Sequence, residues 1–142
     1  MEALVDDSLR GALQVSPARN DAEVVEFLFI GELSRLVGMT PSAIRFYERE
    51  GLITPSRHGR FRVYRSSDRV RLQAISRLRL IGLPIATIRD ALQHFLDLAS
   101  PQAREEARQI LNRHLSSLTQ RQAQIQDEQA RTMALHEQLT QA

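Results

Sequence analysis

The apolar positions near the start of the chain predict a short helix over residues 27–38, FLFIGELSRLVG. Four apolar residues of this stretch recur at helical spacing: Ile30, Leu33, Leu36 and Val37. Gly38 follows them, and glycine commonly ends a helix because it adopts the left-handed conformation without strain. The residues before this helix, 1–26, have no sustained periodicity and include Gly11 and Pro17, so we expect a disordered extension there.

A second helix is expected directly after the first. Thr40 and Pro41 are typical of a helix start, with threonine as the N-cap and proline at the first helical position. This helix should run to about Glu50 and end at Gly51. Two short helices joined by residues 38–40 form a helix-turn-helix, a motif that many helical hairpins share.

The spacing then changes from helical to alternating. Pro55 and the cluster at 56–59 indicate a turn, and arginines alternate with apolar residues over 60–63, the period of a short strand. Leu52 and Ile53 can supply the partner strand. We therefore expect a two-stranded wing whose tip carries Arg57, His58 and Arg60.

Two more helices follow the expected wing. The third, capped by Ser66 or Ser67 and ending at Gly82, turns four apolar residues inward: Val70, Leu72, Ile75 and Leu78. The fourth starts at Pro84, and its buried face carries Ile85, Ile88, Ala91, Leu92 and Phe95. Ser100 and Pro101 break the fourth helix and open a fifth, which has no further glycine or proline.

The fifth helix has a thin apolar seam with alternating spacings of four and three residues. Its members are Leu111, Leu115, Leu118, Gln122, Ile125, Gln129 and Thr132. This is the heptad pattern of a coiled coil, and the glutamines at seam positions can fix its register. A seam this thin favours pairing with a second copy of the chain, although packing back on its own domain is the alternative.

The net charge of +2 is distributed unevenly along the chain. Residues 1–30 hold two arginines against six acids (−4), residues 31–80 eleven against four (+7), and residues 81–142 six against seven (−1). A basic block in one third of the chain is the electrostatic footprint of a polyanion partner, with a solvated basic surface as the alternative.

Composition excludes several classes of function. The chain has no cysteine, which excludes disulfides, zinc-thiolate sites and cysteine-ligated iron–sulfur clusters. The four histidines, at 58, 94, 114 and 136, show no metal-ligand spacing, so we expect no metal site and no cofactor. No stretch approaches the roughly 18 apolar residues of a membrane span, and we expect a cytoplasmic protein. Because the chain has neither a cysteine nor a glycine-rich loop that could hold a phosphate, we expect that it is not an enzyme.

From about residue 28 to the end, the chain resembles the MerR family of transcription regulators. Three segments carry the resemblance: IGELSRLVGMTPSAIRFYEREGLI, GRFRVY and GLPIATIRDAL. The spacing between these segments also matches, including the distance from Tyr64 to Gly82. The GLPIATI segment is similar to the redox-sensing SoxR branch, but this chain lacks that branch's cluster-binding cysteines.

The resemblance implies a mainly α fold, with a winged helix-turn-helix DNA-binding domain followed by a long dimerisation helix that forms an antiparallel coiled coil. It also implies a homodimer on a pseudo-palindromic promoter site, acting by bending and untwisting DNA so that RNA polymerase engages both promoter elements. The expected organisation is an acidic extension (1–26), a DNA-binding domain with a helix pair (27–99) and a coiled-coil helix (100–142). An adaptor that binds a protein, as in chaperone modulators with MerR-like domains, is the alternative.

Helical geometry divides the second helix into a core side and an outward side. With Ile44 as the core anchor, Arg45, Phe46 and Arg49 face outward, while Tyr47 lies at the core edge and does not pair with Phe46. Most relatives carry tyrosine in place of Phe46. The expected DNA-contacting residues of helix and wing are Thr40, Ser42, Arg45, Phe46, Tyr47, Arg49, Arg57, His58, Arg60, Arg62 and Tyr64.

Overall fold

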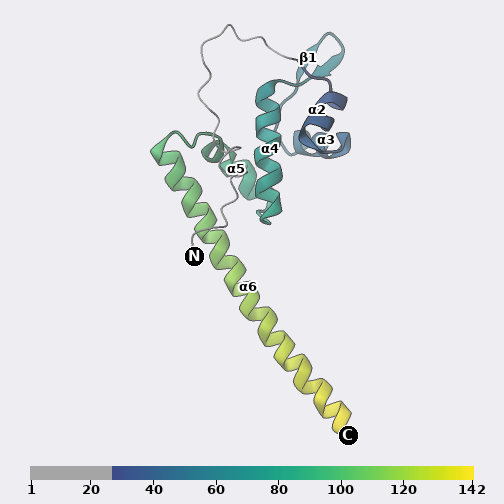
Figure 1. Ribbon diagram of the computed structural model, residues 1–142, viewed down its shortest axis with the longest axis vertical. Coiled ribbons are helices and arrows are strands. Elements are labelled where there is room, and N and C mark those ends of the chain that lie inside the picture. Colours follow the sequence, from purple (N-terminus) through teal and green to yellow (C-terminus); the bar gives the residue numbers. More distant parts are fainter. Residues whose placement is uncertain (1–26) are drawn as a thin grey trace. The chain divides into compact units, whose positions relative to one another are not determined.

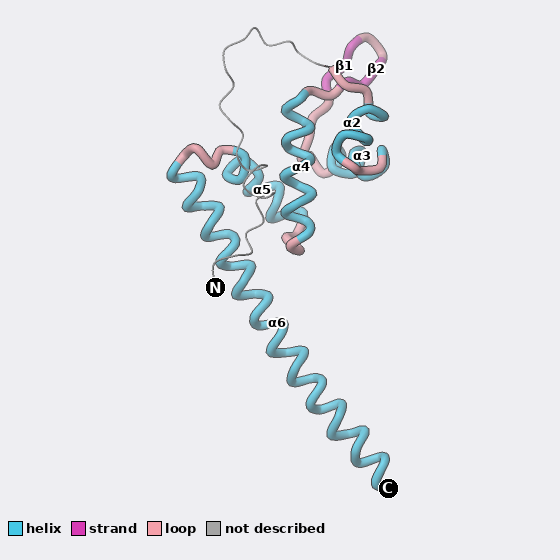
Figure 2. The backbone as a smooth tube through the Cα atoms, in the orientation of Figure 1, coloured by secondary structure: helices cyan, strands magenta, loops and turns pink. Residues whose placement is uncertain are grey.

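The computed structural model describes residues 27–142, and the expectations for residues 1–26 lie outside this part of the chain. The described residues belong to two compact units that meet between Arg104 and Glu105. Five helices and one two-stranded sheet make up the described chain (Figures 1 and 2). This confirms the predicted mainly α fold with a small wing and a long C-terminal helix.

The helix-turn-helix consists of α2 (Ile30–Val37) and α3 (Pro41–Arg49). Gly38 ends α2 in the left-handed conformation with φ of +67°, as the sequence predicts. Thr40 caps α3, because its side-chain oxygen accepts a hydrogen bond from the Ala43 amide at 3.2 Å. The side chain of Ser34 in α2 donates to the carbonyl of Met39, which ties the turn between the helices to the first of them.

The wing consists of β1 (Ser56–His58) and β2 (Phe61–Val63), paired antiparallel with Arg57 opposite Arg62. The predicted pairing with Leu52 and Ile53 is wrong. Both side chains are buried in the core, and residues 56–58, predicted as a turn, form the first strand. The turn lies instead around Gly59, whose φ of +62° gives the chain the left-handed residue that a tight hairpin requires.

A third extended segment joins the wing from the N-terminal side. The backbone amide of Leu28 donates to the carbonyl of Tyr64, and the amide of Tyr64 donates to the carbonyl of Leu28, both at 2.8 Å. This bridge places the segment before α2 beside Tyr64, the residue that directly follows β2. It was not predicted from the sequence.

Helices α4 (Ser66–Leu80) and α5 (Ile85–Leu96) form the predicted helix pair. The predicted cap at Ser66 or Ser67 is wrong: the N-cap is Arg65, whose backbone amide donates to the Asp68 carboxylate at 2.8 Å. Asp68 is 6% exposed, and burial raises the pKa of its carboxyl, partly offset by this hydrogen bond and by Arg71.

The core of the first unit collects apolar side chains from α2, α3, α4, α5 and β2 and from the segments between them, whereas β1 contributes none. The most deeply buried are Tyr64, Leu33, Ile44, Leu52, Leu72, Ile75, Leu83, Ile88 and Leu92. Ile44 anchors α3 here, so the face of that helix opposite Ile44 is left outward. Leu36, one of the four apolar residues at helical spacing in α2, is 46% exposed.

The last helix, α6 (Pro101–Gln141), is continuous and crosses from the first unit into the second (Figure 1). Its start at Pro101 agrees with the sequence prediction. Among the described residues, we find no helix that is long and apolar enough to cross a membrane.

Candidate nucleic-acid interface

The outer face of α3 carries most of the predicted contact residues. Ser42, Arg45, Phe46 and Arg49 are exposed, and Tyr47 is half-buried at the edge of the core. Thr40 is exposed as well, although its hydroxyl oxygen is engaged in capping the helix. An exposed arginine near the start of a helix is suited to bidentate contact with guanine or phosphate.

The rings of Phe46 and Tyr47 lie together, contrary to the prediction that they do not pair. Their centroids are 5.4 Å apart and their planes are inclined at 63°, an edge-to-face contact. Consecutive residues of a helix project about 100° apart, but the long side chains of Phe46 and Tyr47 bend toward one another, so that their rings are in contact. The exposed ring of Phe46 is therefore held in place by the half-buried ring of Tyr47.

The wing presents four basic or ionisable side chains to solvent: Arg57, His58, Arg60 and Arg62. Arg57 and Arg62 are direct partners across the two strands, an arrangement that places like charges side by side. Such a pair is destabilising without a nearby anion. The register of the two strands therefore favours a negative charge close to Arg57 and Arg62.

Glu48 supplies one such negative charge and joins α3 to the wing. Its carboxylate lies 3.5 Å from the Arg62 guanidinium and accepts a hydrogen bond from the Tyr64 hydroxyl at 3.3 Å. The glutamate is only 16% exposed, so solvent screens these interactions incompletely. Recognition helix and wing are thus connected through one partly buried side chain.

Tyr64 lies differently from the prediction that it contacts phosphate. Its side chain is fully buried, with its hydroxyl directed to Glu48. Burial raises the pKa of the Tyr64 phenol, and the Glu48 charge raises it further. The hydroxyl of Tyr64 is therefore not presented at the outer surface of the wing.

Two other arginines fix the C-terminal end of α3 to the helix pair. Arg89 of α5 donates from Nε to the carbonyl of Glu50 at 2.7 Å and forms an ion pair with the Glu50 carboxylate. Arg71 of α4 donates from Nε to the carbonyl of Leu52 at 3.0 Å. These contacts hold the C-terminal end of α3 and the chain that directly follows it.

Glu48 and Glu50 form ion pairs with Arg62 and Arg89, which leaves other arginines of α3 and the wing without an acidic partner. Arg49, which lies between these two glutamates in the sequence, forms an ion pair with neither. Within residues 27–142, Arg45, Arg49 and Arg57 form no ion pair. Arg60 lies over the Phe61 ring, 5.5 Å from its centroid. These unpaired charges are the chemistry that a phosphate backbone would neutralise.

Sequence reasoning missed the linking roles of Glu48 and Arg89. Glu48 is four residues after the core anchor Ile44, and this spacing placed it on the inner side of α3. An acidic side chain on the inner face of a helix needs a cationic or hydrogen-bonding partner. The position of Glu48 could therefore have predicted its contact with another element. For Arg89, 39 residues from Glu50, the local sequence contains no comparable signal.

In the second unit, the predicted seam lies along a largely exposed helix. Leu115 is 60% exposed, Leu118 37% and Ile125 48%. The same four-and-three spacing continues past Thr132 to His136 and Leu139, the latter 72% exposed. Among residues 27–142, there is no group of three or more His, Cys, Asp or Glu residues that could hold a metal ion.

Comparisons with known proteins match almost the whole described chain. Residues 29–94 match the family described as "MerR HTH family regulatory protein", and residues 69–141 match the one described as "MerR, DNA binding". The second match alone covers half of the chain.

Individual relatives agree with these family matches. The chain is 34% identical over 94 residues to the "HTH-type transcriptional regulator ZntR homolog" of Haemophilus influenzae, covering 65% of this chain and 68% of the relative. It is 30% identical over 110 residues to the "HTH-type transcriptional regulator ZntR" of Escherichia coli K12, covering 76% and 77%. The SoxR-like character of GLPIATI stays a prediction.

A solved structure has the same fold. The transcription regulator PbrR691 from Ralstonia metallidurans CH34, in complex with lead(II), superposes with a TM-score of 0.68 over 78% of this chain and 86% of that one, at 24% identity. The helix-turn-helix, the wing and the long helix thus occur together in a known regulator. The chain belongs to the MerR family of transcription regulators and carries that family's DNA-binding domain.

Proposed function

We propose that this regulator binds double-stranded promoter DNA as a homodimer, on a pseudo-palindromic site, and controls transcription by distorting the promoter for RNA polymerase. The observation that carries the proposal is the Glu48 link between α3 and the wing. This link joins the outward arginines of α3 and the arginines of the wing into one surface. A partly buried link of this kind lets helix and wing grip the duplex at a fixed spacing.

The proposed contact residues are Thr40, Ser42, Arg45, Phe46, Tyr47, Arg49, Arg57, His58, Arg60 and Arg62. The outward residues of α3 would meet base edges in the major groove, and the wing residues would meet the flanking backbone. Arginines without acidic partners favour DNA over a protein partner, because they gain most from neutralising phosphates.

The exposed seam of α6 supports the homodimer. Leucine and isoleucine side chains that stay largely exposed over several helical turns lose contact with water only if a second helix covers them. We propose that a second copy of the chain does so, through Leu111, Leu115, Leu118, Gln122, Ile125, Gln129 and Thr132, extended by His136 and Leu139.

A metal signal does not fit the residues of this chain. Two relatives of Rhizobium meliloti are named heavy metal-dependent transcription regulators, and the PbrR691 structure holds lead. Soft metals of this kind select thiolate ligands, but this sequence contains no cysteine. The proposed function therefore involves no thiolate-bound metal.

The DNA contacts can be tested with two arginine variants. Arg45→Ala and Arg62→Ala should each weaken binding to promoter DNA upstream of the gene, and each lost phosphate contact should reduce the slope of log K against log salt by about 0.9. Fluorescence anisotropy between about 50 and 300 mM salt measures both quantities. Arg113→Ala, an exposed arginine of α6 with the same charge change, is the control. Unchanged affinity and slope in both variants would count against the DNA interface.

A further inference from the structure

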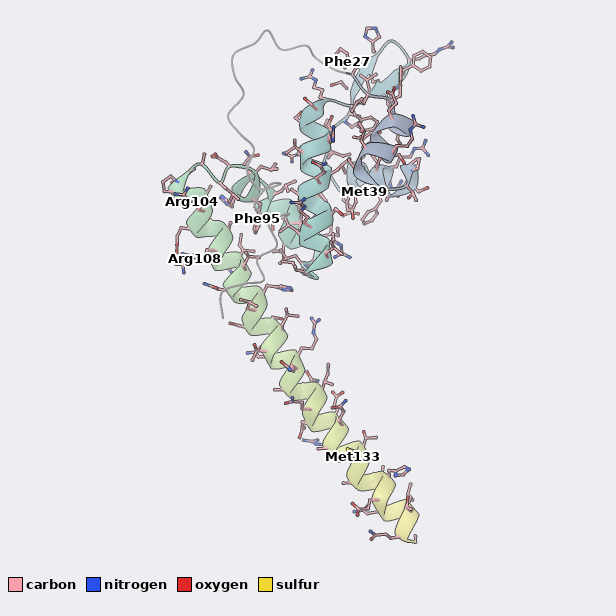
Figure 3. All side chains as sticks on the ribbon, in the orientation of Figure 1. Phe27, Met39, Phe95, Arg104, Arg108 and Met133 are labelled. Carbon is pink, nitrogen blue, oxygen red and sulfur yellow. The ribbon has the colours of Figure 1, made fainter. Side chains whose placement is uncertain are left out.

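Phe27, the first described residue, lies against the wing. The ring of Phe27, which is labelled in Figure 3, stacks on the His58 ring with centroids 6.1 Å apart. The Phe29 ring contacts the Phe61 ring edge to face, with centroids 6.2 Å apart. The Leu28–Tyr64 bridge fixes the backbone between the two phenylalanines. Residues 1–26 are therefore attached at the surface proposed to bind DNA.

The charges of the two regions are opposite and equal in size. Residues 1–26 hold six acids and two arginines, a net charge of −4. Residues 27–65, which contain the helix-turn-helix and the wing, hold seven arginines and three glutamates, a net charge of +4. Of those three glutamates, two are already paired with Arg62 and Arg89, so the unpaired arginines outnumber the acids available to them.

The wing surface also carries exposed aromatic rings beside its charged side chains. Phe27, Phe29 and Phe61 are 46%, 54% and 54% exposed, and they are three of the five phenylalanines of the chain. The residues directly before Phe27 are Glu23, Val24, Val25 and Glu26. They combine acids, which match the wing arginines, with valines, which match the exposed rings.

We infer that the acidic segment 1–26 binds the wing and α3 of its own chain and competes there with DNA. Twenty-six residues reach up to roughly 90 Å when fully extended, so the whole surface is within reach. Tethering gives such a segment an effective concentration that reaches the millimolar range for short flexible linkers, enough for weak ionic contacts to be populated. The inference rests on the proposed function, because it names an intramolecular competitor for the same surface.

Competition of this kind lowers the apparent affinity for every DNA sequence by one factor. That factor is the fraction of molecules whose surface is free. Since both the segment and DNA bind through ionic contacts, the occupied fraction falls as salt rises. The segment thus acts mainly at low ionic strength, where non-specific binding is strongest.

The test uses two full-length triple variants with the same net charge. In the first, Asp21→Asn, Glu23→Gln and Glu26→Gln neutralise the acids nearest the wing. In the control, Asp97→Asn, Glu128→Gln and Glu137→Gln neutralise three exposed acids of the described chain that form no ion pair there. Both variants carry a formal net charge of +5, since each loses three negative charges from a total of +2.

The first readout requires no DNA. Backbone amide resonances of residues 56–63 are compared at about 50 and 500 mM salt, which changes the Debye length from about 14 to about 4 Å. We expect the first triple variant at low salt to resemble the wild-type protein at high salt, while the control matches the wild type at both. Identical wing resonances in all three proteins at low salt would overturn the inference. Resonances that shift with protein concentration would assign the contact to a second copy and overturn the intramolecular form.

The second readout is binding to a random-sequence 30-base-pair duplex. At about 50 mM salt, we expect the first triple variant to bind at least about fivefold more tightly than the control, with the difference disappearing near 500 mM. Equal affinities of the two variants at low salt would contradict competition. If no protein binds DNA while the wing resonances still respond, the proposed function fails and the intramolecular contact stands.

Discussion

Phe46 is an exposed ring on the outer face of α3, held by its edge-to-face contact with Tyr47. No core packing requires it, since it is 38% exposed in a helix that Ile44 already anchors. The resemblance to the MerR family gives tyrosine at this position. The difference between the two residues is one hydroxyl, which can donate to a phosphate oxygen.

The variant Phe46→Tyr should therefore bind promoter DNA more tightly. A hydrogen bond to a charged acceptor contributes about 1.5 kcal/mol or more, which corresponds to roughly tenfold in affinity. The unfolding free energy should change by less than about 0.5 kcal/mol, because the position is exposed. Fluorescence anisotropy measures the first quantity and urea unfolding the second. Phe46→Leu, which removes the ring and adds no hydroxyl, is the control; equal binding by the tyrosine variant and the wild type would place the ring away from phosphate.

Asp68 is the one buried charged residue among those described, and its role is to complete the start of α4. Its carboxylate accepts a hydrogen bond from the backbone amide of Arg65, which would otherwise have no partner. Asp68→Ala should lower the unfolding free energy by about 1 to 2 kcal/mol, whereas Asp68→Asn, whose amide oxygen still accepts the bond, should lose less. Urea unfolding at neutral pH measures this order, and an asparagine variant no more stable than the alanine variant would contradict it.

The raised pKa of Asp68 also predicts a pH dependence with a definite sign. Because the folded-state pKa lies above the unfolded value of about 3.9, the folded protein holds this proton more tightly. The resulting stabilisation is complete below the unfolded pKa and is lost as pH rises through the folded pKa. The unfolding free energy of the wild type relative to Asp68→Asn should therefore be higher near pH 4 than near pH 7. Taking the difference between the two proteins at each pH cancels the contribution of the carboxylates that they share.

At the scale of elements, α3 and the wing are coupled through Glu48. The charge of this residue raises the pKa of the Tyr64 phenol, in addition to the larger effect of burial. Glu48→Gln keeps a hydrogen-bond acceptor and removes the charge. It should lower the Tyr64 pKa toward the value that burial alone sets, and it should release Arg62 from its ion pair.

Ultraviolet titration of the phenol measures this change. The chain has two tyrosines, so the titration is done in a Tyr47→Phe background, in which Tyr64 is the only phenol. A Tyr64 pKa that is the same with glutamate and with glutamine at position 48 would show that the two elements are not electrostatically coupled. Glu137→Gln, which removes a charge from α6, serves as the control.

Element prediction from the sequence succeeded where local signals decide the structure. Gly38, Thr40 and Gly51 set the ends of α2 and α3 as expected, because caps and left-handed glycines act within a few residues. The second strand of the wing, predicted over residues 60–63, lies at Phe61–Val63, but the first strand was misplaced by several residues. Leu52 and Ile53 have strand-like side chains but are buried in the core.

The candidate site was predictable to a similar extent. The outward arginines followed from helical periodicity around Ile44. The contacts of Glu48, Arg89 and Phe27 did not follow, because each joins residues that are 14 or more positions apart and depends on tertiary packing. Tyr64 matched a family motif at the wing, but burial decided its role.

At the scale of the whole molecule, we propose that the exposed seam of α6 carries the contact between two chains. Apolar side chains along the seam gain stability when a second helix covers them, because the contact removes apolar surface from water. Within residues 105–142, Leu115 and Ile125 are exposed members of the seam. They can therefore be changed without removing buried packing from the described chain.

The double variant Leu115→Gln, Ile125→Gln should be monomeric where the wild type is dimeric, and it should bind a palindromic site much more weakly. Analytical ultracentrifugation measures the first effect and anisotropy the second. Ala123→Gln, Ala130→Gln places the same amides on another face of the same helix and should remain dimeric. A double seam variant that still dimerises would assign the dimer to another surface.

The Leu28–Tyr64 bridge has a consequence for the order in which the first unit folds. Its two hydrogen bonds close a loop between residues 36 positions apart, so their formation bears a larger entropic penalty than any helical turn inside that loop. On the ribosome, Leu28 leaves the exit tunnel 36 residues ahead of its partner Tyr64. The edge from which the acidic segment departs is therefore completed only after α2, α3 and the wing hairpin have all left the exit tunnel.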